Sequence, residues 1–290
     1  MGEREKWGYL FSLPYIIYLS LFFIGPVIYL IFLSFTHFNG FSAPSWVGFE
    51  NWVLVLGDQK VWHAVRNTAF FAIIFVPLQT IVALILAFLM QKTTLGTTTL
   101  RVMYFLPVVT PWVAATVIFS VLLLPEVGIV SRFVAKFGLN NAQWYLSSNW
   151  MEVMGTLAVL NTWKGIGSSM VIYTSGLQGI SKEVNEAAII DGASTWERFK
   201  HITMPLISPT TYLIVVLSTI SAFQVFDLVL LLAGNDKSTS IHVLNTLIYR
   251  SSFGELAFGE AAVITWVLIV VVFLLNVIYR ALEKRLVHYE

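Results

Sequence analysis

The sequence has no cysteine in its 290 residues and few charged side chains, and each scarcity excludes a class of protein. Without cysteine the chain cannot form disulfide bonds, thiolate zinc sites or a cysteine nucleophile. Lys, Arg, Asp and Glu make up 11% of the residues, whereas a soluble domain carries roughly 25%. The net charge is only +1, so no long-range field attracts nucleic acid or an acidic partner. A soluble enzyme and a disordered chain are therefore excluded.

Hydrophobic residues, by contrast, amount to 57% of the chain and gather in long runs. A spanning helix needs about 20 apolar residues to cross roughly 30 Å of hydrocarbon. We therefore predict an all-α integral membrane protein in which residues 1–290 form a single transmembrane domain. The first run exceeds the roughly 7 to 15 apolar residues of a signal peptide, and no small-residue cleavage site follows it, so we expect it to span as well. The six predicted transmembrane helices cover about residues 9–35, 65–90, 102–124, 151–173, 206–232 and 260–281.

The distribution of Lys and Arg orients this bundle. Six spans place both termini on one side, where ten of the 17 basic residues lie; six lie on the other side and Lys164 lies within a span. Because Lys and Arg concentrate in cytoplasmic segments, we predict that both termini are cytoplasmic. The aromatic residues of the outward segments are expected at the membrane interface, namely Phe41, Trp46, Phe49, Trp52, Trp62, Trp144, Tyr145 and Trp150.

Proline residues interrupt several of the predicted spans. Proline donates no backbone hydrogen bond, and hydrocarbon tolerates the freed carbonyls only where neighbouring helices or a cavity satisfy them. The interrupted helices therefore either line a pathway or carry kinks that only improve packing. The interruptions fall at Pro14, Gly25-Pro26, Pro77, Pro107 and Pro111.

The inward loop between the fourth and fifth spans, residues 178–205, is longer than a simple connector requires. Ser181 is placed to cap a short helix, and Gly192 is placed to end it. Ser194 followed by Glu197 predicts a capping box that begins a second helix. The loop is therefore expected to have a structure of its own.

The first helix of this loop presents small side chains on one face, where Val184, Ala187, Ala188 and Asp191 follow at i, i+3, i+4 and i+7. Such a narrow face suits a groove in another protein. A helix that rests on lipid headgroups would instead carry bulky apolar residues and basic flanks. We interpret this face as a docking surface on the cytoplasmic side.

The same loop resembles a known motif. Glu186-Ala187-Ala188, then Gly192 after three residues, Ile202 after nine more and Met204-Pro205, resembles the EAA loop of the membrane subunits of binding-protein-dependent ABC importers, with Met204 where the family has leucine. In that family the loop is a coupling helix that docks into a cytoplasmic ATPase subunit. The resemblance implies that residues 181–204 are such a coupling loop, with its coupling site at Glu186, Ala187, Ala188, Asp191 and Gly192.

The resemblance covers almost the whole chain and narrows to carbohydrate-uptake permeases of the maltose, raffinose, multiple-sugar and glycerol-phosphate type. The segment Gly234-Asn235-Asp236 departs from it, since the family commonly has Gly-Gly-Pro there. The resemblance implies a multi-pass protein of the prokaryotic cytoplasmic membrane, which moves a sugar or oligosaccharide through the bilayer. Our hypothesis for the mechanism is alternating access. The implied partners are a second homologous permease, a cytoplasmic ATPase dimer and an extracytoplasmic solute-binding protein.

Transport against a gradient needs an energy source, and a Walker A loop would reveal one in this chain. The sequence has none; the nearest string, Asp236-Lys237-Ser238, lacks the glycine before the lysine. We therefore expect no enzymatic activity and no cofactor in this chain. The resemblance implies that ATP and Mg are bound by the partner ATPase.

Neutral sugars call for amide, hydroxyl and aromatic groups in an otherwise apolar cavity. Polar residues at membrane depth face the bundle interior or a pathway more often than lipid. Each such residue can instead hydrogen-bond between helices, and in some importers of this class only one of the two permeases contacts substrate. The substrate-pathway candidates are Gln79, Asn161, Trp163, Tyr173, Ser218, Ser221 and Gln224, with Tyr212 as a further polar residue at depth.

Lys164 and Asp227 are charged residues within predicted spans. Their positions along the spans differ in depth by roughly 15 Å at about 1.5 Å of rise per residue, so we do not expect them to pair. We expect Asp227 near the outer interface, and Lys164 either to snorkel or to bond carbonyls freed near Gly165 and Gly167.

Other classes of membrane protein remain as alternatives. An ion-coupled secondary transporter is the main one, with Asp227 as a proton or sodium site. A haem-bearing or quinone-linked subunit needs paired His ligands within spans, but all five histidines fall at span ends or in loops. A pure scaffold does not explain the kinked helices and the polar groups at depth. The sequence leaves open the identity of the sugar and which permease holds its main site.

Overall fold

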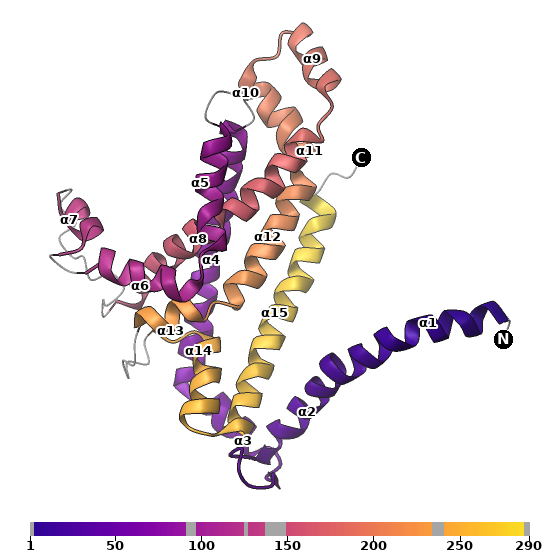
Figure 1. Ribbon diagram of the computed structural model, residues 1–290, viewed down its shortest axis with the longest axis vertical. Coiled ribbons are helices and arrows are strands. Elements are labelled where there is room, and N and C mark those ends of the chain that lie inside the picture. Colours follow the sequence, from indigo (N-terminus) through magenta and orange to yellow (C-terminus); the bar gives the residue numbers. More distant parts are fainter. Residues whose placement is uncertain (1–2, 91–96, 125–126, 137–148, 234–240, 287–290) are drawn as a thin grey trace. The chain divides into compact units, whose positions relative to one another are not determined.

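The computed structural model describes residues 3–90, 97–124, 127–136, 149–233 and 241–286, which are almost entirely helical (Figure 1). The segments Gly234-Asn235-Asp236 and Asp236-Lys237-Ser238 lie outside the described residues, as do Trp144 and Tyr145. The chain divides into two compact units. One comprises Met1–Trp62 with Leu247–Val267, and the other comprises His63–Thr246 with Leu268–Glu290.

The first unit begins with a long apolar helix made of three consecutive segments, α1 (Glu3–Leu19), the π-helical η1 (Ser20–Ile24) and α2 (Gly25–Ser34). The π turn directly precedes Pro26, and it lets the Gly25 N–H reach the Ser20 carbonyl. A two-stranded antiparallel hairpin follows, in which β1 (Thr36–His37) pairs with β2 (Ser45–Trp46), and then comes α3 (Glu50–Gly57).

The hairpin is tied to its neighbours in this unit by polar contacts. The buried Asn51 amide donates to the carbonyls of Ser34 at 3.1 Å and Thr36 at 2.9 Å. The Phe258 N–H, at the start of α15 (Phe258–Leu286), donates to the Phe38 carbonyl at 3.0 Å. These bonds satisfy backbone groups that the short strands leave open.

Most of the remaining helices lie in the second unit, and some of them continue one another. Their bounds are α4 (Gln59–Leu89), α5 (Thr97–Val109), α6 (Trp112–Leu122), α7 (Ile129–Ala135), α8 (Trp150–Gln178), α9 (Lys182–Ile190), α10 (Thr195–Arg198), η3 (Phe199–Thr203), α11 (Met204–Leu206), α12 (Ser208–Phe223), α13 (Asp227–Ala233), α14 (Leu244–Tyr249) and η5 (Arg250–Gly254). Of these, α4 begins in the first unit, α14 ends in it, and η5 belongs to it entirely.

Three described helices are long and apolar enough to cross a membrane unaided: Leu10–Ser34, Gln59–Leu89 and Phe258–Ala281. They correspond to the first, second and sixth predicted spans. The helix α8 covers the fourth predicted span and extends five residues beyond it, but its polar residues leave it outside this apolar set. The total of six spans stays a prediction.

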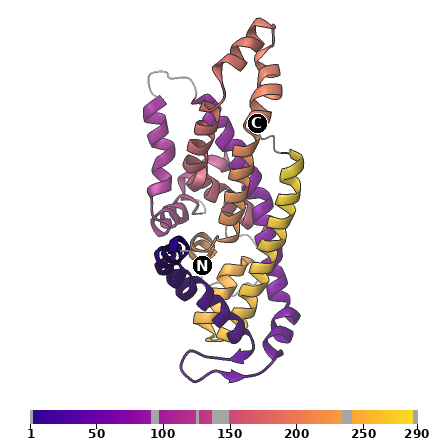
Figure 2. The same cartoon turned by 90° about the vertical axis from the view of Figure 1, so that its right-hand side faces the viewer.

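The third predicted span is not one straight helix. Residues 102–124 form α5 and α6, which meet at 108° (Figures 1 and 2). Thr110 and Pro111 lie at the break, and Pro111 has extended ψ and no N–H for the preceding turn. The expectation of a continuous helix was wrong here because two prolines, Pro107 and Pro111, remove neighbouring backbone donors.

The fifth predicted span is also shorter than expected. The helix α12 ends at Phe223, and α13 begins as a separate helix at Asp227, so residues 206–232 do not form one helix. At its other end α12 is bent by 63° from the helical segment Thr195–Leu206. In the second unit α4, α12 and residues 268–286 of α15 run side by side (Figures 1 and 2).

Two apolar clusters form the interior of the second unit. One joins Phe71 and Phe75 of α4 to Met154 and Leu157 of α8 and to Leu228 of α13. The other joins Ala83 and Ala87 of α4 to Met170 and Tyr173 of α8 and to Ile214 of α12. Because α4, α8 and α12 each contribute to both clusters, this unit packs around these three helices.

Candidate coupling loop and substrate pathway

The helix α9 has the caps that its sequence predicts. The Ser181 hydroxyl accepts the Glu183 N–H at 3.2 Å, which satisfies one open donor of the first turn. At the other end Gly192 adopts φ +80°, and the Ala193 N–H reaches back to the Ala188 carbonyl at 2.9 Å. A left-handed residue that closes a helix in this way is normally glycine, since a Cβ disfavours that conformation.

The second helix of the loop begins with the predicted capping box. The Glu197 N–H donates to the Ser194 hydroxyl at 3.3 Å, and the Ser194 N–H donates to the Glu197 carboxylate at 2.8 Å. The Ser194 hydroxyl and backbone hydrogen bonds lower the pKa of the Glu197 carboxyl. From there α10, η3 and α11 form one helical run to Leu206, which leads into α12.

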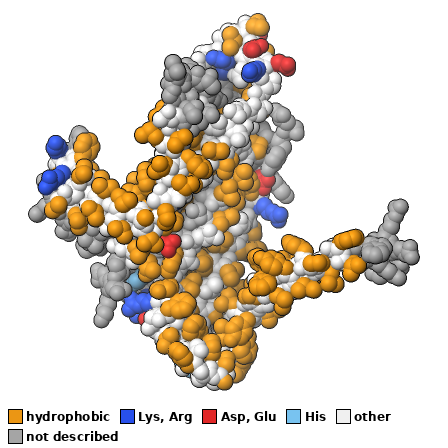
Figure 3. Space-filling view, viewed as in Figure 1, with side chains coloured by type: hydrophobic (Ala, Val, Ile, Leu, Met, Phe, Trp, Pro, Cys, Tyr) orange, Lys and Arg blue, Asp and Glu red, His pale blue; other side chains and the backbone are white. Residues whose placement is uncertain are grey.

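The loop is exposed and carries most of its charge at its tip. No residue of α9 is buried, and the space-filling view shows Lys, Arg, Asp and Glu side chains gathered over α9 and α10, whereas the bundle below is mainly apolar (Figure 3). Of the predicted coupling residues, Glu186, Ala187, Asp191 and Gly192 are exposed and Ala188 is half-buried.

Two residues of this surface were missed by the sequence reasoning. Ile190 is 86% exposed, and its neighbour Ile189 is also exposed, although both are bulky and apolar. A pair of aliphatic residues just before a helix-ending glycine, in a loop otherwise rich in charge, was the available signal. Trp196 is exposed as well, and its ring stacks on Phe199.

The substrate-pathway candidates fall into two groups. Gln79 and Tyr173 are buried and join helices: the Gln79 amide donates to the Ser169 hydroxyl at 2.8 Å, and the Tyr173 hydroxyl donates to Thr211 at 3.2 Å. Interhelical bonding was the alternative considered for each of them. Trp163, Ser221 and Gln224 are exposed, and the Trp163 ring contacts Phe119 of α6 edge to face.

Asn161 and Ser218 differ from these residues. Both are 5% exposed, and neither side chain makes a hydrogen bond within the described part of the chain. Their polar groups thus remain open to a partner. Among the seven candidates, these two side chains are therefore the best candidates to hydrogen-bond a ligand.

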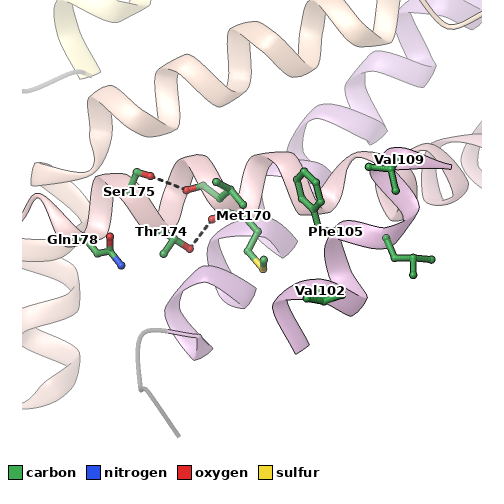
Figure 4. A pocket seen from close by; sticks show the side chains of 9 residues that line it. Val102, Phe105, Val109, Met170, Thr174, Ser175 and Gln178 are labelled. Carbon is green, nitrogen blue, oxygen red and sulfur yellow. Dashed lines mark hydrogen bonds between the residues drawn. The ribbon is translucent and has the colours of Figure 1, made fainter. Parts of the chain in front are cut away.

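A pocket of about 500 Å³ lies between α5 and α8 (Figure 4). Its wall on α5 is apolar, whereas the C-terminal part of α8 contributes Thr174, Ser175 and Gln178. The Thr174 and Ser175 hydroxyls donate to the Met170 and Val171 carbonyls of their own helix. None of the seven candidates lines this pocket. The sequence contained a signal for it, namely the polar residues Thr174, Ser175 and Gln178 on neighbouring turns of α8.

A second hollow, of about 630 Å³, lies between α4, α12 and α15. Its lining is almost wholly apolar. The hydroxyls of Thr219 and Tyr279 lie 2.9 Å apart in it, and the hydroxyl of Thr80 donates to the Val76 carbonyl of its own helix. Such a lining does not suit a sugar, which needs several convergent polar groups.

One of the two expectations for Lys164 was that it bonds carbonyls freed near Gly165 and Gly167. The structure does not show such a bond in the part of the chain that it describes. The Lys164 ammonium donates instead to the Val108 carbonyl of α5 at 2.9 Å and lies 5.2 Å from the ring centroid of Trp112 on α6. The carbonyl is open because the helix breaks just after it. Asp227 lies at the start of α13, and no ion pair between it and Lys164 occurs among the described residues.

Comparisons with known proteins agree with this architecture. The family model described as "Binding-protein-dependent transport system inner membrane component" matches residues 79–288. The probable ABC transporter permease protein YesP of Bacillus subtilis (strain 168) is 30% identical over 98% of this chain and 92% of its own length. The lactose transport system permease protein LacF of Rhizobium radiobacter is also 30% identical, over 96% of this chain and 95% of its own length.

Two further comparisons extend the likeness. The trehalose/maltose transport system permease protein MalF of Thermococcus litoralis is 28% identical over 92% of this chain and 91% of its own length. A chain of a bacterial ABC transporter involved in the import of the acidic polysaccharide alginate has the same fold, with a TM-score of 0.80 at 22% identity over 99% of this chain and 98% of that one.

Proposed function

The chain belongs to the inner membrane components of binding-protein-dependent transport systems, as an ABC permease of the carbohydrate-uptake type, and we propose that it forms one half of a sugar translocation pathway. The other half is a second, homologous permease. All six predicted spans belong to this permease domain, with the bent pair α5 and α6 as the third. Both termini lie in the cytoplasm, on the side of α9.

The energy for transport comes from a separate ATPase dimer that binds ATP and Mg. The sequence has no Walker A loop of its own, and the permease is not itself the enzyme. The helix α9 docks into the ATPase through Glu186, Ala187, Ala188, Asp191 and Gly192. The observation that carries this assignment is an exposed helix, capped at both ends, in which no residue is buried in the part of the chain that the structure describes.

Transport follows an alternating-access cycle. A solute-binding protein delivers the sugar on the extracytoplasmic side, and closure of the ATPase dimer moves α9. A solved structure of the same fold is a bacterial alginate ABC transporter in complex with an alginate pentasaccharide-bound periplasmic protein, which supports a solute-binding protein as a partner. Asn161 and Ser218 are the residues of this chain that we expect to meet the sugar.

The coupling assignment is tested by comparing two faces of α9. Ala187→Trp places a bulky ring on the small-residue face, whereas Lys182→Trp, at another exposed position of α9, places the same ring at least about 120° from every residue of that face. We expect Ala187→Trp to reduce ATPase co-purification and ATP-driven uptake in proteoliposomes about tenfold, a loss of roughly 1.4 kcal/mol in docking. Lys182→Trp should retain both.

The outcome also separates this function from its rival. Uptake that continues without ATP and stops when the ion gradient is dissipated would identify an ion-coupled secondary transporter. Equal losses in the two tryptophan variants would show that the face of α9 does not matter, and they would contradict docking through the alanines.

A further inference from the structure

One side chain touches both sides of the break in the third span. The Lys164 ammonium donates to the Val108 carbonyl, in the last turn of α5, and lies against the ring of Trp112, the first residue of α6. The local hydrogen bonds described for Thr110 point back to α5 and do not reach α6: its N–H donates to the Pro107 carbonyl at 3.2 Å and its hydroxyl to the Leu106 carbonyl at 3.1 Å. The helix α6 has no side-chain cap. A contact from a third helix therefore holds the bend.

The surroundings suit a cation at this place. A charged side chain at membrane depth is costly unless protein groups replace its water. The C-terminal carbonyls of α5 carry the negative end of the helix dipole, and the face of an indole ring attracts an ammonium. An apolar residue at position 164 would leave the Val108 carbonyl without its described partner. The charge and the bend thus stabilise each other.

Lys164 lies on a helix that leads directly to the coupling loop. The helix α8 is uninterrupted from Trp150 to Gln178, and Ser181 then caps α9. One turn from Lys164, Gly167 packs so closely on α5 that a Cβ would collide with the Tyr104 carbonyl and crowd the Phe105 Cα. Consequently α5 and α8 are held as one body, while α6 can turn at Thr110 and Pro111.

We propose that Lys164 is a positioning residue that fixes the angle between α5 and α6 and passes movement of the coupling loop to that bend. This role rests on the proposed function, because it assigns α9 as the site where the ATPase acts. A shift of α9 displaces α8 together with α5, the ammonium keeps its bond to the Val108 carbonyl but moves relative to Trp112, and α6 turns against α5. Lys164 acts through these two groups and not by binding sugar.

The test uses the assembled transporter, with both permeases, the ATPase dimer and the solute-binding protein, in proteoliposomes. Lys164→Met keeps an unbranched side chain but removes the charge and the donors, and Lys164→Arg keeps both. Thr156→Val, at a half-buried position earlier on α8 whose hydroxyl bonds only within its own helix, is the matched control. We expect Lys164→Met to hydrolyse ATP but to transport about tenfold less sugar per ATP, with an unchanged half-saturating sugar concentration. Lys164→Arg should recover much of the loss.

A distance measurement separates positioning from general damage. Spin labels at Val102 on α5 and Val121 on α6, both exposed, report the angle of the bend. In the wild-type complex we expect a narrow distance distribution that shifts when ATP and Mg are added. In Lys164→Met we expect a broad distribution that ATP does not shift, whereas Thr156→Val should match the wild type.

Three results would overturn the proposal. An identical, ATP-responsive distribution in Lys164→Met would show that the ammonium does not hold the bend. Normal transport per ATP in that variant would show that it does not pass on movement. A raised half-saturating concentration with unchanged turnover would make Lys164 a substrate contact. Failure of the proposed function is recognised separately, because the wild-type complex itself would then show no ATP-driven uptake.

Discussion

The coupling loop and the paired helices α5 and α8 are stabilised by different kinds of interaction. In the loop each capping group lies within six residues of its partner, as with Ser194 and Glu197, and the side chains are exposed. Between α5 and α8 the contacts join residues far apart in the chain, such as Lys164 and Val108, and they depend on close backbone approach at Gly167. The loop can therefore form and unfold locally, whereas the helix pair unfolds only together with the whole unit.

Gly167→Leu should have the largest effect, because it acts on the helix pair. Its Cβ has no room beside the Tyr104 carbonyl and the Phe105 Cα, and both of these are backbone atoms that cannot rotate away. We expect a loss of about 3 kcal/mol or failure to fold. The control is Gly155→Ala on the same helix, where nothing lies within 4 Å of the added carbon. Thermal unfolding of detergent-purified protein measures both.

If Gly167→Leu and Gly155→Ala melted at the same temperature, the close approach of α5 and α8 would not contribute to stability. The helix pair would then not depend on long-range packing more than the coupling loop does.

Ser169→Ala tests a buried polar contact within the same unit. The Gln79 amide donates to the Ser169 hydroxyl, and the Gln79 carbonyl oxygen already has no hydrogen-bond partner in the described structure. Removing the hydroxyl leaves both ends of a buried amide unpaired, which should cost about 1 to 2 kcal/mol. The double variant Gln79→Leu with Ser169→Ala should recover much of this loss. A double variant less stable than Ser169→Ala alone would contradict this account.

Gly192→Ala tests whether the coupling loop is stabilised locally. Gly192 has φ +80° but open space around its Cβ position, so the substitution strains the backbone without a collision. We expect a local cost of about 1 kcal/mol, seen as faster amide exchange at the end of α9, with no change in the melting temperature of the bundle. A fall in global melting temperature would show that the loop is part of the cooperative unit after all.

The same division explains how much the sequence could predict. The caps of α9 and α10 were predicted because Ser181, Gly192, Ser194 and Glu197 find their partners nearby, where short-range chemistry decides. The two prolines indicated a disturbance in the third span but not a bend of 108°, since its angle depends on Lys164, 56 residues along the chain from Val108. Contacts of that range follow from packing, which periodicity does not reveal.

The candidate pathway shows the same limit. Polarity at membrane depth selected Gln79, Asn161, Tyr173 and Ser218 alike, but it did not separate residues that bond other helices from residues that stay open. In the structure Gln79 and Tyr173 have partners on other helices, whereas Asn161 and Ser218 have none among the described residues. That distinction depends on which side chains face each other across two helices.

Acidification should have the smallest effect, and it should be confined to the capping box of the coupling loop. The Ser194 hydroxyl and N–H hold the pKa of the Glu197 carboxyl below its ordinary value. A carboxyl whose pKa is lowered by folding stabilises the folded form above its unfolded value, and this contribution is lost as pH falls through the lowered folded pKa. Amide exchange near Glu197 should therefore become faster at low pH in the wild type.

The variant Ser194→Ala is the control. It should lose about 1 kcal/mol of local stability at neutral pH, so the same amides should already exchange faster at neutral pH and respond less to acid. An equal acid response in both proteins would mean that groups other than this capping box stabilise the start of α10.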